Sequence, residues 1–248
     1  MIDTHAHLDA CAEPADTLLD RARAAGVNRV IAVGSGIDSC RASLEIARRQ
    51  DGVACALGIH PHQAGGDDAG RLDELRTMLA DPKAVAVGET GLDFYRDYAP
   101  RAAQRRLFNA QLELASELAL PIVVHTRAAG DETADLLAGF GGTVVMHCFS
   151  SPELLPVAIE RNYYVSFAGN VTFPRAEDLR EAAARVPADR ILSETDCPYL
   201  APQPVRGRPN EPANVVHTVG VLAAARGETT DSLAAQIDDN AGRAFGLA

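Results

Sequence analysis

Short apolar runs alternate with helix-like stretches along this chain, and that pattern limits the folds open to it more than any other property. The apolar runs cover residues 1–5, 29–34, 53–59, 84–88, 122–125, 143–147, 163–167 and 191–194. Between them lie stretches rich in Ala, Leu, Arg and Glu, such as 100–118 and 176–186, whose apolar residues recur at helical spacing. Strands that alternate with helices predict parallel βαβ units.

The number of these units and the length of the chain favour a closed barrel. An α/β barrel of roughly 250 residues commonly forms one domain, and this chain has 248 residues. A doubly wound open sheet is the competing architecture, but no G-x-G-x-x-G motif follows a predicted strand, which argues against a dinucleotide-binding fold. We therefore predict an α/β protein, a single (β/α)8 TIM-type barrel that spans residues 1–248 as one domain.

Composition excludes several classes of protein. A net charge of −11 argues against a broad basic surface for nucleic acid, so a phosphate substrate must be captured locally. The 5 cysteines form no C-x-x-C pair, which argues against a disulfide framework and against a cysteine zinc site. No apolar run approaches the ~20 residues of a membrane span, and no basic leader precedes the first apolar run. We expect a cytoplasmic protein with no membrane partner.

The histidines mark one end of the predicted barrel. Of the 7 His, all except His217 lie at or just beyond the C-terminal end of a predicted strand. They are His5, His7, His60, His62, His125 and His147. Such strand ends meet at the same mouth of a barrel. A single histidine is more often a hydrogen-bonded core residue, and we interpret His217 on its predicted helix that way, but the shared placement of the others indicates a common site.

The spacing and types of these residues predict a metal centre. His5 and His7 are separated by one residue, so both imidazoles project from the same side of a strand. His125, His147 and Asp196 would add nitrogen and oxygen ligands from other strands. Such a mixture suits Zn²⁺, Mn²⁺, Fe²⁺ or Ni²⁺, with Mg²⁺ at a more carboxylate-rich position. We expect two divalent metal ions in the barrel mouth.

Two ions in one mouth usually share a bridging anion. Some barrel hydrolases use a carboxylated lysine, but the only lysine here, Lys83, precedes the fourth predicted strand and so lies near the opposite rim. Glu89, just after that strand, is the remaining candidate. Its neighbours Gly88 and Gly91 would permit a tight turn beside the ions. The simpler interpretation of 88–93 is a glycine-containing turn with an exposed acid.

A metal pair of this kind predicts hydrolysis of a phosphate ester. Two neighbouring cations lower the pKa of a water toward ~7 and stabilise charge on the attacking and leaving oxygens. Asp196 can accept the proton of the attacking water, so Asp196 and Glu89 are the predicted catalytic residues. Glu194 is either a further ligand or the partner of one. Arg127, Arg206 and Arg208 lie on loops at the same mouth, where guanidinium groups can clamp a phosphate.

Seven motifs carry a family resemblance that covers nearly the whole chain. They are IDTHAHLD at 2–9, GIHPH at 58–62, GETGLD at 88–93, PIVVHTR at 121–127, MHCFS at 146–150, ETDCPYL at 194–200 and RPNEP at 208–212. In this combination and order, the chain resembles TatD-related deoxyribonucleases of the metal-dependent amidohydrolase superfamily. The resemblance implies a TIM-type barrel and divalent-metal-dependent DNase activity, as 3′-5′ exonuclease action on single-stranded ends.

The resemblance also implies roles for individual residues. The implied metal ligands are His5, His7, Glu89, His125, His147 and Asp196. Glu89 would bridge the two ions, and His60 and His62 would lie near the substrate phosphate. Two other interpretations stay open. The same centre suits a metal-dependent amidohydrolase, lactonase or phosphotriesterase that acts on a small molecule, because fold and metals do not determine the substrate. A non-catalytic barrel that serves as a binding module is the third.

Overall fold

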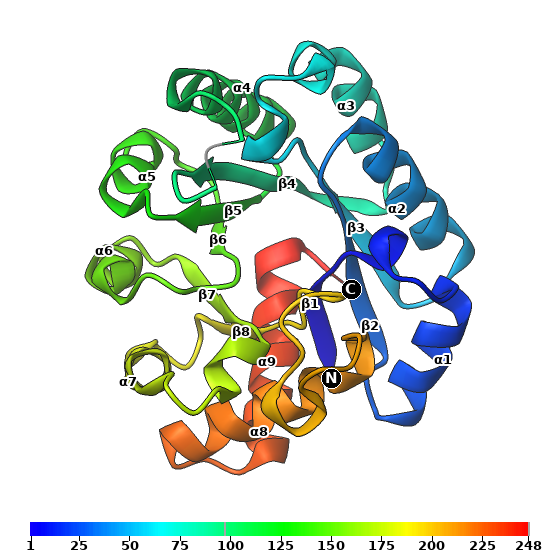
Figure 1. Ribbon diagram of the computed structural model, residues 1–248, viewed down its shortest axis with the longest axis vertical. Helices are drawn as coiled ribbons and strands as arrows, with labels where there is room; N and C mark the ends of the chain where they lie inside the picture. Colours follow the sequence, from blue (N-terminus) through cyan, green and yellow to red (C-terminus); the bar gives the residue numbers. More distant parts are fainter. Residues whose placement is uncertain (97, 248) are drawn as a thin grey trace.

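The computed structural model describes residues 1–96 and 98–247, in which eight parallel strands form one sheet in sequence order from β1 to β8 (Figure 1). The strands are β1 (Ile2–Ala6), β2 (Arg29–Gly34), β3 (Val53–Leu57), β4 (Ala84–Asp93), β5 (Ile122–Arg127), β6 (Val144–Met146), β7 (Tyr164–Phe167) and β8 (Ile191–Ser193). The sheet curves round so that the segment after β8 returns to β1. The predicted α/β barrel is confirmed, with every predicted strand present.

Helices follow the strands and cover the outside of the barrel (Figure 1). They are α1 (Ala15–Ala24), α2 (Ile37–Arg49), α3 (Leu72–Leu79), α4 (Arg101–Leu118), α5 (Gly130–Leu137), α6 (Leu155–Glu160), α7 (Glu177–Arg185), α8 (Val215–Arg226) and α9 (Thr230–Phe245). The helices predicted at 100–118 and 176–186 are α4 and α7. Within the described part of the chain, none of the helices combines the length and hydrophobicity that a bilayer-spanning segment needs.

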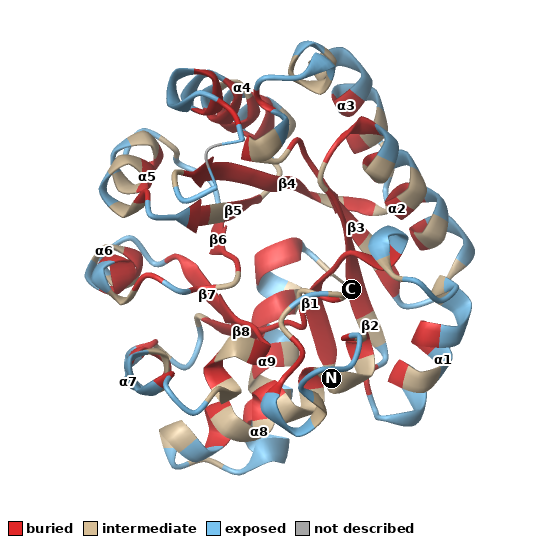
Figure 2. Ribbon diagram, in the orientation of Figure 1, coloured by how far each residue is buried: buried red, intermediate tan, exposed pale blue. Residues whose placement is uncertain are grey.

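The residue pattern explains this division into strands and helices. A strand such as β2, with the sequence RVIAVG, is buried on both faces, which suits the continuous apolar run of a parallel sheet. A helix such as α2 buries only one face, through Ile37, Cys40, Leu44 and Ala47 at helical spacing. Figure 2 shows the result, a barrel of buried strands inside helices whose outer sides are exposed. The core therefore lies within the barrel and between barrel and helices.

The junction between the segment after β8 and β1 positions the site. The backbone N–H of Asp196 donates to the carbonyl oxygen of His5 at 2.9 Å. Next to this contact in the sequence, the carboxylate of Asp3 accepts two hydrogen bonds from Thr195, one from its backbone N–H at 2.8 Å and one from its hydroxyl at 2.5 Å. Burial raises the pKa of Asp3 to about 8 despite these hydrogen bonds. The segment of Thr195 and Asp196 is thus held beside β1, although the two lie far apart in the sequence.

The turn expected over 88–93 is wrong, because β4 continues through this segment. The pairing of β4 with β5 shifts register there, which marks a bulge. Gly88 and Gly91 have φ of +142° and +135°, a region that glycine adopts without strain. A Cβ at Gly91 would lie 2.0 Å from the backbone oxygen of His125 on β5. Since the chain stays in the sheet, Glu89 is buried rather than exposed at a turn.

Candidate metal centre

A cavity of about 640 Å³ opens at the C-terminal end of the barrel strands. It is lined by side chains that arise from different strands, as the histidine pattern predicted. The predicted site residues in its lining are His7, His60, His62, Glu89, His125, Arg127, His147 and Asp196. His5 is fully buried and contacts His7. The structure therefore brings every predicted metal ligand to one mouth.

On one side of the cavity, two imidazoles and two carboxylates converge. His5 Nε2 and His7 Nε2 lie 3.2 Å apart. Asp196 Oδ1 is 3.8 Å from the first of these nitrogens and 3.5 Å from the second. Glu89 Oε2 is 3.7 Å and 3.4 Å from the same two atoms. Nitrogens from β1 and the residue just after it, and oxygens from β4 and the segment after β8, thus surround a common point. This donor set is one that Zn²⁺ and transition metals accept.

On the other side, three imidazoles converge on the second oxygen of Glu89. Oε1 of Glu89 lies 2.8 Å from His125 Nδ1, 3.0 Å from His147 Nε2 and 3.3 Å from His60 Nε2. These imidazoles come from β5, from the residue after β6 and from the segment after β3. His60, which was expected near the substrate phosphate, stands in this second group of possible ligands.

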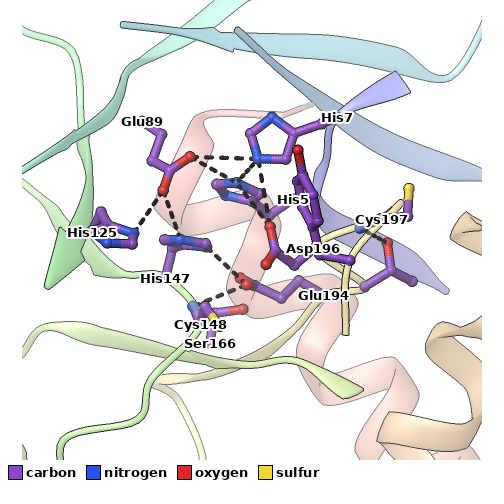
Figure 3. Close-up of polar contacts among 12 residues, drawn as sticks. His5, His7, Glu89, His125, His147, Cys148, Ser166, Glu194, Asp196 and Cys197 are labelled. Carbon is purple, nitrogen blue, oxygen red and sulfur yellow. Dashed lines mark hydrogen bonds and ion pairs between the residues drawn. The ribbon is translucent and has the colours of Figure 1, made fainter. Parts of the chain in front are cut away.

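Glu89 is common to both groups, because its Oε2 faces one and its Oε1 faces the other (Figure 3). Three ligand atoms of the first group lie within 4.8 Å of one another, and so do three of the second. Imidazole nitrogens and carboxylate oxygens that converge at this spacing fit divalent cations. A carboxylate that presents one oxygen to each group is a ligand that two cations can share.

Glu194 holds the outer side of the His147 ring. Its Oε1 lies 2.9 Å from His147 Nδ1 and accepts the backbone N–H of Cys148 at 2.9 Å. Metal-binding histidines almost always donate the second ring N–H to a carboxylate, carbonyl or water, which fixes the ring orientation. Glu194 makes the contact of such a partner. The contact is the one expected of the partner of a ligand, and the role of Glu194 stays a prediction.

Asp93 makes the corresponding contacts on the β4 side, and the sequence interpretation missed it. Its Oδ2 lies 2.8 Å from His62 Nε2 and 3.4 Å from His125 Nε2. The side chain of Asp93 is buried. A signal was present in the sequence, because Asp93 ends the GETGLD motif and so lies at the same mouth as the histidines.

Neighbouring carboxylates favour a positive charge on two of the imidazoles, His7 and His147, whereas burial lowers the pKa of His5 to about 3 and also lowers that of His60. Burial opposes protonation of His7, but hydrogen bonds to Asp196 and Glu89 raise its pKa to about 10. Against the same effect of burial, the charges of Glu194 and Glu89 raise the pKa of His147 well above its ordinary value. Protons on these rings offset the carboxylate charge, and a bound cation would do the same. The carboxylates of the site therefore favour positive charge beside His7 and His147.

The predicted phosphate-binding residues divide into two sets. His62 and Arg127 line the cavity. Arg206 and Arg208 are exposed on the loop after β8, outside the cavity lining. The guanidinium of Arg206 packs 4.1 Å from the ring centre of Phe173 instead. The structure thus places one of the three arginines beside the ligand groups, and a substrate contact for Arg208 stays a prediction.

Comparison with known proteins agrees with this geometry. The family model described as TatD related DNase matches residues 2–246. The uncharacterized metal-dependent hydrolase TatD of Mycobacterium tuberculosis is 38% identical over 260 residues, which cover 100% of this chain and 98% of that protein. The 3′-5′ ssDNA/RNA exonuclease TatD of Klebsiella pneumoniae is 35% identical over 241 residues, which cover 94% of this chain and 92% of that protein.

Solved structures share the fold. The crystal structure of YJJV, a TatD homolog from Escherichia coli, matches with a TM-score of 0.94 and 31% identity over 100% of this chain and 98% of that one. A TatD family hydrolase from Entamoeba histolytica matches with a TM-score of 0.88 at 19% identity, over 100% and 98%. These matches confirm the resemblance drawn from the motifs. The chain therefore belongs to the TatD-related DNase family and is a metal-dependent hydrolase.

Proposed function

We propose that this enzyme is a phosphodiesterase that removes nucleotides from the 3′ ends of single-stranded DNA with two divalent metal ions. The observation that carries the proposal is the carboxylate of Glu89, whose two oxygens face separate groups of imidazoles. A relative with 35% identity bears the name 3′-5′ ssDNA/RNA exonuclease, which supports the choice of substrate. We further propose action in the cytoplasm, as the odd number of cysteines without close spacing suggests.

The two groups would each hold one ion. The residues for the first ion are His5, His7 and Asp196, those for the second are His125 and His147, and Glu89 lies between. His60 is a further donor for the second ion. Mixed nitrogen and oxygen donors favour Zn²⁺, Mn²⁺, Fe²⁺ or Ni²⁺, with Mg²⁺ the alternative nearer the carboxylates. When bound, the ions would supply a nucleophilic water at neutral pH and offset the charge of the phosphate.

The protein's own side chains would hold the substrate and accept the proton. Asp196 points Oδ1 at the first histidine pair, and its side chain is 13% exposed toward the cavity. Asp196 is therefore the proposed acceptor of the proton of the attacking water. Glu194 fixes the ring of His147, and Arg127 at the cavity edge can pair with a phosphate oxygen.

Hydrolysis of a single-stranded DNA oligomer by the metal-loaded enzyme tests this proposal. We expect His125→Ala and Asp196→Asn each to lower nucleotide release by about 100-fold or more, with the circular dichroism of the folded barrel retained. His217→Ala is the matched control, because His217 lies on α8 outside the cavity lining, and it should keep full activity.

Two outcomes would contradict the proposal. Turnover of small amides or lactones without nucleotide release would identify a small-molecule hydrolase with the same centre. If elemental analysis found no tightly bound metal in the purified protein, a binding role without catalysis would be favoured instead.

A further inference from the structure

Three tyrosines stand exposed at the mouth of the barrel. Tyr95, Tyr98 and Tyr199 are 65%, 64% and 57% exposed, and within residues 1–96 and 98–247 they are the large apolar side chains that water reaches most. Tyr95 and Tyr98 follow β4, and Tyr199 follows β8, so all lie at the end that carries the cavity. Exposed aromatic area that gathers at one place indicates a binding surface, because core packing does not require it.

Tyr199 lines the cavity, and Tyr98 packs against His62, which lines it on the other side of the barrel mouth. The Tyr98 ring lies 4.7 Å from the His62 ring at an interplanar angle of 82°. The Tyr199 ring lies 6.0 Å from the His7 ring at 71°. In a barrel with strand order β1 to β8, β4 and β8 are half a circuit apart. The two tyrosines are therefore aromatic walls with the ligand groups between them.

The faces of these rings are available to a flat ligand. A near-perpendicular contact between two rings covers at most one face of either, so each tyrosine keeps a face open to solvent. Nucleobases are flat and stack on such faces regardless of sequence. A base inside a duplex has its faces covered by its neighbours, whereas an unpaired terminal base is free to stack on protein. Open tyrosine faces therefore select unpaired bases.

The third tyrosine positions a cation beside the same cavity. The guanidinium carbon of Arg127 lies 4.1 Å from the centre of the Tyr95 ring, and Arg127 lines the cavity. An aromatic face attracts a guanidinium in this position. On a chain with a net charge of −11, this arrangement supplies positive charge where a phosphate backbone would approach.

We propose that Tyr98 and Tyr199 stack on the unpaired bases on either side of the scissile phosphate, while Arg127, held by Tyr95, contacts the phosphate backbone. The inference rests on the proposed function and adds its base-binding subsites. A phosphodiester carries a nucleoside on each side, so a phosphate at the ligand groups directs one base toward each wall. Recognition of base faces makes the enzyme selective for single strands and tolerant of sequence.

Equilibrium binding tests these subsites independently of turnover. Mg²⁺-loaded protein is titrated into a fluorescein-labelled single-stranded oligothymidylate whose 3′ linkages are phosphorothioates that resist hydrolysis. A matching oligomer lacks the two 3′-terminal bases but keeps the sugars and phosphates. We expect the wild type to bind the base-bearing oligomer more tightly, and Tyr98→Ala or Tyr199→Ala to weaken that binding by about 5-fold or more, so that the preference over the abasic oligomer is lost.

Matched variants separate stacking from general damage. Tyr98→Phe and Tyr199→Phe keep the ring and should keep the preference. Phe140→Ala removes a ring before β6, at the opposite end of the barrel, and should also keep it. Equal wild-type affinity for both oligomers, or an equal loss on both in the alanine variants, would overturn the proposal.

The proposed function can fail separately from the subsites. If an unmodified oligomer releases no nucleotides but the preference and its loss are observed, the nuclease assignment fails and the base-binding walls stand. Nucleotide release without any preference for the base-bearing oligomer would leave the nuclease assignment intact and contradict base stacking by Tyr98 and Tyr199.

Discussion

Asp93 connects the rim of the cavity to two of its imidazoles. Its Oδ1 accepts the backbone N–H groups of Tyr95 and Arg96, both at 3.0 Å. Its Oδ2 lies near the Nε2 atoms of His62 and His125. Burial alone would raise the pKa of this carboxyl, but its hydrogen bonds, above all to His125, hold the pKa below its ordinary value. Asp93 is therefore a charged positioning residue for the second group of ligands.

We expect Asp93→Asn to lower metal affinity or nucleotide release by about 10- to 100-fold, the usual cost of losing the partner of a metal-binding histidine. The amide keeps the size of the side chain but lacks the charge that orients His125. Competition with a chromophoric chelator measures the affinity. Asp67→Asn, at an exposed position after β3, is the control and should change neither quantity. Unchanged affinity in the Asp93 variant would show that the contact is incidental.

For single residues, the sequence predicts which ones gather at the barrel mouth better than it predicts the contacts between them. His5 and His7 could be placed together because alternate residues of a strand share a face. For Asp93 the motif indicated the mouth of the barrel but not the contacts, because an acid after two glycines has the same pattern in a turn and in a bulged strand. For Glu194, strand alternation predicted the direction of the side chain but not its distance from His147. Metal ligation by any of these residues stays a prediction.

Among the helices, α4 anchors two segments of the mouth through two buried glutamines. Gln104 Oε1 accepts the N–H of Asp93 at 2.8 Å, and its Nε2 donates to the carbonyl of Asp93 at 3.0 Å. Gln111 pairs in the same way with Ile59, at 2.8 Å and 2.9 Å. Ile59 directly precedes His60. The helix thereby holds the end of β4 and the start of the His60 segment in place.

Gln111→Leu should destabilise the fold by about 1–3 kcal/mol, because it leaves the buried N–H and carbonyl of Ile59 without partners. Urea unfolding measures the change in the free energy of unfolding. Arg106→Leu, on the exposed side of the same helix, serves as the control and should stay close to wild type. A Gln111→Leu variant as stable as this control would contradict the anchoring role.

The order of elements could be predicted because each strand is a continuous apolar run and each helix repeats its apolar residues at helical spacing. The end of β4 could not be predicted, because glycines such as Gly88 and Gly91 are typical of turns. The strand instead has a bulge between Val87 and Thr90, where Gly88 has a positive φ. That local conformation depends on close pairing with β5, a tertiary contact that no local pattern reveals.

For the molecule as a whole, we propose that residues 1–248 unfold as one cooperative domain. Buried residues from every strand of the barrel join a single hydrophobic cluster, which supports this proposal. Scanning calorimetry should show one transition, and a second, separate transition would contradict a single domain.

Removal of metal should lower the melting temperature without adding a transition. A ligand that binds only the folded chain stabilises it by about 2.7 kcal/mol at a concentration of 100 times its Kd. For a chain of this size, that corresponds to a shift of roughly 5–10 °C. Calorimetry before and after chelation, followed by readdition of Mn²⁺ or Zn²⁺, measures it. An unchanged melting temperature would argue against a structural contribution from the proposed ions.

The hydrogen bond between Asp196 and His5 has a consequence for biosynthesis. On the ribosome, His5 is synthesised well before Asp196. A nascent chain that has not yet reached Asp196 therefore has only part of the proposed first ligand group. Under the proposed function, hydrolysis would therefore begin only after the segment that carries Asp196 has joined β1.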